Sequence, residues 1–339
     1  MPELRRDPLS GRWVVFSTER RRRPTDFQVG LTSQALESPF THGREYLTPP
    51  EVFAIRPNNG PHNSADWQVR VVPNRYPALR VEGDLTRRPD CIYDSMTGIG
   101  AHEVVIETHQ PDIPFHMLPP EQIVRVLEAI RARWDDLRRD VRLKHLVAFK
   151  NHGALAGATL RHPHSQIVAT PFVPPAAAAR LDAAREHFAR TDRSLFQDIL
   201  ETERQVGERV IVQNHEFAAF CPYASRTPFE IAVYPSFQSN DFSRCQSHDF
   251  WPLAEILREV LARLYASLDD PPFNLLLISA PLQENALRWP TIREDFRWHI
   301  EILPRLAIFA GFEMATGCFI NTVTPEEAAR HLRQVQLSR

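Results

Sequence analysis

Two histidines separated by one residue, His162 and His164, and a glutamine two residues further on, Gln166, have the types and spacing that phosphoryl-group chemistry needs. A neutral imidazole, whose ordinary pKa is about 6.5, attacks phosphorus through one ring nitrogen while a hydrogen bond at the other nitrogen fixes the tautomer. In a β-strand these three side chains share one face, because residues i, i+2 and i+4 point the same way. Pro163 then points outward, which predicts an edge strand where a missing N–H is tolerated.

The loop upstream of these residues has the composition of a phosphate-binding segment. Residues 151–159 read NHGALAGAT, with small residues that let the backbone approach a ligand and a hydroxyl that can donate a hydrogen bond. An H-x-H pair alone is better explained as core histidines bonded to the backbone or as a surface zinc site. The glutamine and the upstream loop together favour a catalytic nucleophile.

The flanking sequence predicts the elements that position these residues. Alternating and β-branched stretches predict strands, and apolar residues at three- and four-residue steps predict a long helix at 120–139. The second half repeats the order strand, strand, long helix, strand, loop, strand, with its helix at 250–268. The predicted strand segments are 67–73, 103–108, 146–150 and 166–171 in the first half, and 210–220, 229–235, 273–279 and 298–304 in the second.

This repetition predicts an α+β fold built by pseudo-duplication, with mostly antiparallel sheets and helices on one face. We expect a first domain at 1–173 that carries the nucleophile, a helical connecting segment at 174–206 and a second domain at 207–339.

Composition excludes several classes of protein. The 339 residues carry a formal net charge of -2, so the overall field gives no general affinity for nucleic acid or for an anionic membrane. The N-terminal residues lack the apolar core of a signal peptide, and no apolar run approaches the roughly 20 residues that span a bilayer, so we expect a cytoplasmic protein. The four cysteines form no C-x-x-C pair, which argues against a disulfide framework and a zinc knuckle.

The segment FKNHGALAGATLRHPHSQIVATP resembles the active-site segment of the galactose-1-phosphate uridylyltransferase family, a branch of the histidine triad superfamily, and of its ADP-glucose phosphorylase relatives. The resemblance extends over most of the chain. It includes GRWVVFSTERRRRPTDF, DWQVRVVPNRYPAL and GAHEVVIET in the first half, and RTPFEIAVYP, WHIEILPR and GFEMATGCFIN in the second. It implies two histidine triad-like halves, of which only the first retains the nucleophile.

The resemblance implies catalytic roles for the three residues of the motif. His164 would attack the α-phosphorus of a nucleoside diphosphate sugar and carry the nucleoside monophosphate, while the backbone carbonyl of His162 holds its other ring nitrogen. Gln166 would donate its amide to a phosphoryl oxygen. Hydrolases of the superfamily carry a third histidine at that position, so a glutamine favours transfer over hydrolysis.

The resemblance also implies residues that bind the nucleotide sugar: Arg20 and Arg23 for phosphates, Asn74, Asn151, Gly157 and Thr159 for the nucleotide and its phosphates, and Glu313 for the hexose hydroxyls. Guanidinium forks suit the geometry of phosphate. Simpler interpretations exist for some of them. The arginine run suits a solvated loop, Asn74 a turn, Gly157 a left-handed backbone and Glu313 an exposed carboxylate.

The structural metal sites of the family are altered in this sequence. The first uses C-x-x-C and two histidines, but Ser38 and Thr41 stand in the cysteine positions, with His102 and His162 as the residual ligand positions. His42 is a conceivable substitute. The ligand positions of a second site hold three poor ligands: Ser194, Gln197 and Arg297. Because a hydroxyl is a poor Zn²⁺ ligand beside a thiolate or an imidazole, we predict that the structural zinc is lost and that no metal cofactor is bound.

These features predict a nucleotidyltransferase that moves a nucleoside monophosphate from a nucleotide sugar to a second acceptor in a ping-pong reaction. The acceptor is a hexose 1-phosphate in a uridylyltransferase-like reaction, or inorganic phosphate in an ADP-sugar phosphorylase-like one. Phe312, where the uridylyltransferases carry tyrosine, weakens the case for galactose. A non-catalytic nucleotide sensor and a nucleotide hydrolase are the alternatives from other classes. We expect a homodimer, with the nucleotide bound where the halves or the subunits meet.

Overall fold

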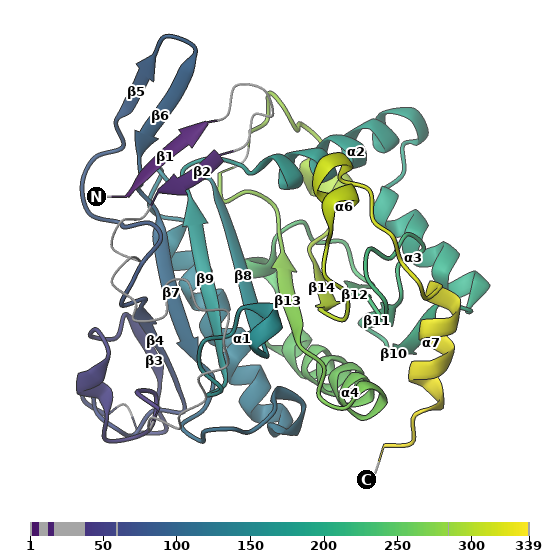
Figure 1. The fold of residues 1–339 in the computed structure, drawn as a ribbon, viewed down its shortest axis with the longest axis horizontal. Coiled ribbons are helices and arrows are strands. Elements are labelled where there is room, and N and C mark those ends of the chain that lie inside the picture. Colours follow the sequence, from purple (N-terminus) through teal and green to yellow (C-terminus); the bar gives the residue numbers. More distant parts are fainter. Residues whose placement is uncertain (1, 7–12, 17–37, 59, 284, 338–339) are drawn as a thin grey trace.

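The computed structural model describes residues 2–6, 13–16, 38–58, 60–283 and 285–337. Within these ranges the chain forms a ten-stranded sheet, a separate four-stranded sheet, and helices on both faces of the larger sheet (Figure 1). Every neighbouring pair of strands in the two sheets is antiparallel. The predicted α+β fold with antiparallel sheets is therefore confirmed, but helices lie on both faces of the large sheet and not on one, because the connecting segment 174–206 packs on the second face.

The large sheet contains strands from both halves of the chain. Its spatial order is β10 (Val210–Gln213), β11 (Phe217–Phe220), β12 (Ile231–Pro235), β14 (His299–Pro304), β13 (Phe273–Ile278), β8 (His145–His152), β9 (His164–Thr170), β7 (Ala101–Ile106), β4 (Val69–Pro73) and β3 (Phe53–Ile55).

The order of strands around the central β8–β13 pair shows the duplication. Moving outward from β8, the strands β9, β7, β4 and β3 follow, and moving outward from β13, the strands β14, β12, β11 and β10 follow. Phe149 of β8 pairs with Leu276 of β13 at the centre. Their partners on the other side also correspond, because Phe149 pairs with Gln166 of β9 and Leu276 pairs with Glu301 of β14. The two halves thus join as one continuous sheet.

Two long helices, α1 (Pro120–Leu137) and α4 (Phe250–Leu268), cover one face of this sheet. Both lie where the apolar spacing predicted a helix. In α1 a proline occupies the first position, where its missing N–H breaks no helical hydrogen bond. The buried face of α1 includes Ile123, Val126, Leu127, Ile130, Trp134 and Leu137. It joins α4 and the apolar face of the sheet in a single core.

The connecting segment is helical, as predicted, and consists of α2 (Pro175–Thr191) and α3 (Leu195–Val206). These helices cover the opposite face of the second half, where Leu181 packs near Ile278 and Leu200 packs against Ala218. The first half has no such helical cover on this face among the described residues. Short helices follow near the C-terminus: α5 (Ile292–Asp295), α6 (Gly311–Thr316) and α7 (Pro325–Gln334).

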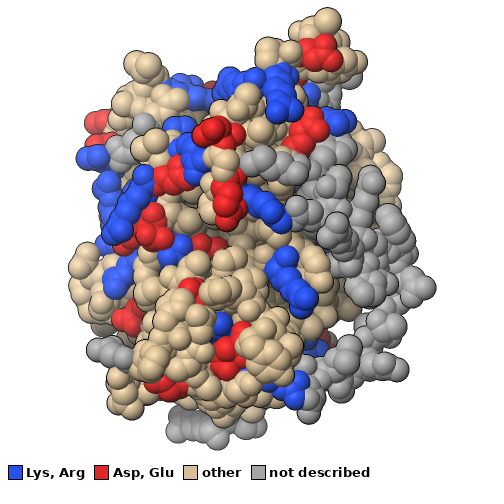
Figure 2. Space-filling model, turned by 90° about the vertical axis from the view of Figure 1, so that its left-hand side faces the viewer, with Lys and Arg blue, Asp and Glu red and all other residues tan. Residues whose placement is uncertain are grey.

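The sequence analysis missed the small sheet, whose order is β2 (Trp13–Phe16), β1 (Glu3–Arg6), β6 (Tyr93–Thr97) and β5 (Arg87–Asp90). Among the described residues, no helix combines the length and the apolar composition needed to cross a membrane. On the side of the molecule nearest β3 and β4, positive and negative side chains are interspersed rather than gathered by sign (Figure 2). This mixture agrees with the near-neutral net charge.

The burial of His145 makes stability depend on pH. This first residue of β8 is 6% exposed, and burial lowers its pKa to about 4. The folded pKa lies below the unfolded value of about 6.5, so the unfolded chain binds the proton more tightly and stability falls as pH decreases. We expect this residue to remove about 2 kcal/mol from the free energy of unfolding between roughly pH 7 and roughly pH 5.

Urea unfolding of the wild type and of His145→Gln at the two pH values measures this contribution. The glutamine variant should lose correspondingly less stability on acidification. An identical pH dependence in the two proteins would show that His145 is not buried in its neutral form.

Candidate active site

His164 is the first residue of β9, an inner strand between β7 and β8. The prediction of an edge strand at Pro163 is therefore wrong. Pro163 is buried and precedes the ladder, so its missing N–H removes no ladder hydrogen bond, while its carbonyl accepts a hydrogen bond from the Glu107 amide at 3.2 Å. His162 also precedes the strand. His164 and Gln166 share one face of β9, as predicted from their spacing.

The His164 ring is held in one tautomer by its own chain. Its Nδ1 lies 2.8 Å from the carbonyl oxygen of His162, and because a carbonyl can only accept, Nδ1 carries the proton. Nε2 therefore has the lone pair. Burial lowers the pKa of His164, opposed by the His162 carbonyl and assisted by the charge of Lys150. The ring is consequently a neutral imidazole near pH 7, the form that can attack phosphorus.

His162 is fixed by a second carbonyl. Its Nε2 donates to Thr108 O at 2.7 Å, and burial lowers its pKa. Its Nδ1 is buried and has no hydrogen-bond partner among the described residues. The ring of Phe40 lies edge-on to both histidines, with 5.6 Å between ring centroids in each pair.

A buried ion pair supports the backbone on the opposite face of β9. The Lys150 ammonium donates to the Glu107 carboxylate at 2.7 Å and to the His164 carbonyl at 3.3 Å. The Ser165 hydroxyl donates to the other oxygen of Glu107 at 2.5 Å. The sequence analysis missed this group, although charged residues at the ends of two apolar strands were an available signal. Removing one partner of such a pair leaves an uncompensated buried charge.

Gln166 is oriented by His102. The ring Nδ1 of His102 accepts a hydrogen bond from the Ala78 amide at 3.1 Å, so its Nε2 carries the proton and donates to Gln166 Oε1 at 2.8 Å. The NH₂ group is then the donating end of the glutamine. His102 pairs with Val168 on β9, four residues from the His164 position and so roughly 13 Å along the strand. The predicted grouping of His102 with His162 as ligand positions of one site is therefore wrong.

His109, which the sequence analysis did not select, lies near His162 instead, and its charge contributes to the lowered pKa of that residue. Its ring stacks on His42, with 4.1 Å between centroids and 17° between planes. His42 Nε2 donates to the Trp67 carbonyl at 3.0 Å. Among the described residues, no three His, Cys, Asp or Glu side chains are arranged to hold a metal ion.

The three altered positions of the second site lie together. Arg297 is buried, and its guanidinium donates to Gln197 Oε1 at 2.6 Å and to the Pro235 carbonyl at 2.9 Å. Ser194 lies alongside and donates to the Asp295 carbonyl at 3.1 Å. Burial lowers the pKa of Arg297 to about 10, so the guanidinium remains a cation at neutral pH. A fixed positive charge stands where the resemblance implied a metal ion.

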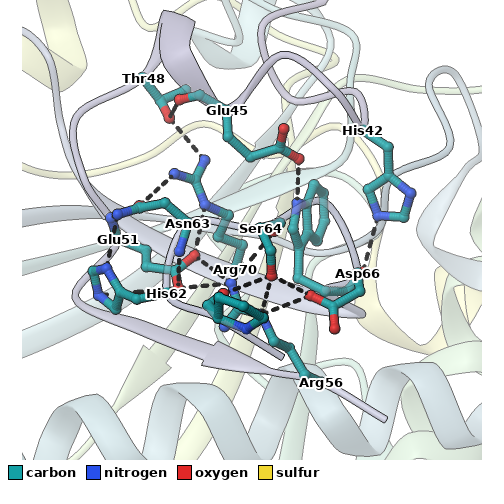
Figure 3. A network of polar contacts seen from close by, with 12 residues as sticks. His42, Glu45, Thr48, Glu51, Arg56, His62, Asn63, Ser64, Asp66 and Arg70 are labelled. Carbon is teal, nitrogen blue, oxygen red and sulfur yellow. Dashed lines mark hydrogen bonds and ion pairs between the residues drawn. The ribbon is translucent and has the colours of Figure 1, made fainter. Parts of the chain in front are cut away.

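A polar network holds the segment that precedes β4 against the sheet (Figure 3). Glu51 is 4% exposed and accepts from Arg56 at 2.7 Å and from Arg70 at 2.9 Å. Arg56 also donates to Asp66 at 3.0 Å. Trp67, which follows, donates its indole N–H to Glu45 at 2.8 Å. The network fixes Trp67 and, through its carbonyl, the His42–His109 stack.

The predicted nucleotide-binding residues fall into three groups. Asn151 and Gly157 flank a short 3-10 helix, Ala154–Ala156, and Gly157 has φ 89°, the left-handed conformation that the simpler interpretation required. Thr159 is exposed in the same loop. Asn74 accepts from the Tyr76 amide at 2.9 Å, which is a turn contact. Arg20 and Arg23 lie outside the described residues, so their role stays a prediction.

Glu313 is not brought to His164 within one chain. It lies in α6, where it accepts a hydrogen bond from the Ala310 amide at 2.9 Å. In Figure 1, α6 lies in the upper part of the view, whereas β9 begins at the lower end of the sheet.

These features define a class of protein. A buried neutral imidazole with a fixed tautomer, an oriented amide on the same strand face and an adjacent glycine loop have the chemistry that a histidine-dependent nucleotidyltransferase needs, on a duplicated α+β fold.

Comparison with known proteins supports this class. A family model described as galactose-1-phosphate uridyl transferase, N-terminal domain, matches residues 1–174, and a model for a domain of unknown function matches residues 120–338. ADP-glucose phosphorylase of Arabidopsis thaliana is 33% identical over 99% of this chain and 94% of that protein. Galactose-1-phosphate uridylyltransferase of Thermotoga maritima is 28% identical over 99% of each protein.

Solved structures agree as well. The crystal structure of the Arabidopsis thaliana ADP-glucose phosphorylase with bound ADP-glucose superposes with a TM-score of 0.77 at 32% identity, covering 99% of this chain and 100% of that one. A uridylyltransferase structure gives a TM-score of 0.79 at 27% identity, covering 98% and 97%. The chain belongs to the galactose-1-phosphate uridylyltransferase family, and it is an enzyme of the nucleotidyltransferase type.

The lowered pKa of His164 predicts the pH dependence of the first half-reaction. The rate should stay level as pH falls to about 6.5 and decline only below it, because the nucleophile is lost on protonation. Glu107→Gln removes a negative charge that raises the pKa of His164, so the decline should move to lower pH. Lys150→Met removes a positive charge that lowers this pKa, so the decline should move to higher pH.

Single-turnover rates of nucleotidyl transfer across the pH range measure both shifts. The two variants serve as controls for each other, since each breaks the same ion pair. Shifts in the same direction would contradict the electrostatic explanation.

Proposed function

We propose that the chain is an ADP-glucose phosphorylase-like enzyme, which takes a nucleoside monophosphate from a nucleotide sugar and transfers it to inorganic phosphate. The observation that carries the proposal is the Nδ1–H hydrogen bond from His164 to the His162 carbonyl, because it leaves Nε2 as a neutral, oriented nucleophile. The similarity to ADP-glucose phosphorylase over nearly the whole chain supports this choice of donor and acceptor.

The proposed reaction has two steps. His164 Nε2 forms a bond to the α-phosphorus of the nucleotide sugar, and the bond from this phosphorus to the bridging oxygen breaks, which releases a sugar 1-phosphate. A phosphate oxygen then attacks the same phosphorus, and the phosphorus–nitrogen bond breaks to give a nucleoside diphosphate and free His164. The His162 carbonyl stabilises the positive charge that develops on the ring in the first step. The Gln166 amide, oriented by His102, would donate to a phosphoryl oxygen.

A second candidate is transfer to a hexose 1-phosphate, as in the uridylyltransferases. It is favoured by the match to that family and by the 28% identity to the Thermotoga maritima enzyme. The same chemistry applies, with a sugar phosphate oxygen as the second nucleophile. Phe312 in place of the tyrosine of the uridylyltransferases argues against galactose as the sugar.

We propose that the active unit is a homodimer, since Glu313 can contact a hexose at His164 only from a second copy of the chain. Exposed apolar side chains around α6 support pairing in this region, with Ile308 89%, Met314 77% and Ile320 63% exposed. We also place the enzyme in the cytoplasm. Its cysteines are unpaired, with Cys91 and Cys318 exposed as thiols, which suits a reducing compartment.

A covalent intermediate tests the proposal directly. Incubation with ADP-glucose or UDP-glucose radiolabelled in the α-phosphate should label the wild type but not His164→Ala, because no other group can replace the nucleophile. His187→Ala is the matched control, since this histidine pairs with Asp198 on the connecting helices. The label should be released by acid and survive alkali, as expected for a phosphorus–nitrogen bond.

Each of the other outcomes identifies an alternative nucleophile or an alternative function. A label that resists acid, or a labelled His164→Ala, would point to a hydroxyl nucleophile such as Ser165 or Thr159. Free monophosphate indicates a hydrolase, and binding without label indicates a nucleotide sensor. Adding phosphate or a hexose 1-phosphate to the labelled enzyme then shows which acceptor discharges it.

We propose that no structural zinc is bound, because hydroxyls replace two thiolates and His42 stacks on His109. Elemental analysis of protein purified without chelator should give far less than one zinc per chain. The double variant Ser38→Cys, Thr41→Cys should gain zinc, since thiolates bind it strongly. Stoichiometric zinc in the wild type would contradict the proposal.

A further inference from the structure

The second half of the chain has a histidine, His299, at the position that corresponds to His164, and this histidine is enclosed by other side chains. His299 is the first residue of β14, as His164 is of β9, and its Nδ1 donates to the Arg297 carbonyl at 3.0 Å. Its ring is 2% exposed and packs among Phe196, Tyr234 and Phe296. Phe196 belongs to α3, and no helix covers His164 in this way among the described residues. A contribution of the second half to catalysis would therefore be made at the site of the first half.

One side chain of the second half does reach that site. Asn274 of β13 pairs in register with Asn151 of β8, and both lie on the His164 face of the sheet. The Asn274 NH₂ group makes two hydrogen bonds, donating to Asn151 Oδ1 at 2.9 Å and to the Ala156 carbonyl at 2.9 Å. A single amide thus ties together the two ends of the loop that leads to Gly157.

The first of these bonds orients the Asn151 amide. Because Oδ1 accepts from Asn274, the NH₂ group of Asn151 is the end that can donate to a ligand. This group lies beside the loop glycine, since a Cβ placed on Gly157 would be 3.6 Å from Asn151 Nδ2. A donor with a fixed direction next to a left-handed glycine suits a phosphate oxygen.

The turn before β13 braces the same loop. The ring Nε2 of His152, next to Asn151, hydrogen-bonds to the Asp270 carboxylate at 2.6 Å. Gly153 packs so closely on Pro272 that a Cβ at this glycine would lie 2.8 Å from the proline Cβ. The loop is therefore held at its beginning by packing and at both ends by Asn274.

We propose that Asn274 is a positioning residue for the nucleotide, acting through the amide of Asn151. The inference rests on the proposed function, in which Asn151 contacts the nucleotide phosphates. Its consequence is that the second half, whose own histidine is enclosed, fixes the direction of a donor in the first half.

The isosteric variant Asn274→Asp tests the role. A carboxylate cannot donate to Asn151 Oδ1, so Asn151 would turn its NH₂ group toward the carboxylate and present its oxygen to the phosphate. We expect KM for the nucleotide sugar to rise about tenfold, with a smaller change in kcat. Asn214→Asp is the matched control, because it removes an amide donor from the Pro252 carbonyl within the second half. The two variants should have similar Tm values, and the control should keep the wild-type KM.

A double-mutant cycle separates positioning from a general structural effect. In an Asn151→Ala background, Asn274→Asp should change KM little further, because the group it orients is absent. An unchanged KM in Asn274→Asp, or full additivity of the two substitutions, would overturn the proposal. Labelling of His164→Ala would instead refute the proposed function, so the two failures are distinguishable.

Discussion

The antiparallel pairing of β8 with β13 is the contact on which the rest of the structure depends. Each strand would otherwise be the exposed edge of a half-sheet, with a row of unpaired backbone groups. Their pairing makes one sheet of ten strands, beneath which α1 and α4 share a single apolar core. It also places the end of β8, which carries Asn151, against residues of the other half. The loop that follows β8 is thus held by residues of the second half.

Both halves use the same backbone arrangement for a histidine and differ in what covers it. In each, the ring Nδ1 donates to the carbonyl two residues earlier, at 2.8 Å for His164 and 3.0 Å for His299. Phe196 of α3, Tyr234 of β12 and Phe296 pack around His299, while the corresponding face of the first half has no helical cover among the described residues. Glu301 occupies the position of Gln166 and is bound by Arg180 and Arg226. Burial opposes its ionisation, but the hydrogen bond with His299 and the charges of the two arginines lower its pKa. The two halves therefore differ in the layer that covers the histidine and not in the strand that carries it.

Much of this architecture could be predicted from local pattern. The helix at 250–268 was predicted at its observed bounds, since apolar spacing and length are both local signals. The small sheet could not be predicted, because strands such as Arg87–Asp90 carry no apolar alternation. Pattern also cannot show a strand's neighbours, and so Pro163 was assigned to an edge. The sequence analysis grouped His162 with His102. The histidine that lies near His162 is His109, which belongs to the loop after β7, and strand patterns give no information about loops.

Arg297 has a consequence for how the protein is made. A metal that crosslinks a domain must be acquired during folding and can be lost to a competing chelator, so folding depends on metal supply. A guanidinium in that place is synthesised with the chain, forms at once its bonds to Gln197 and Pro235, and does not exchange. The contacts that Arg297 makes with α3 and β12 are therefore supplied by the chain itself.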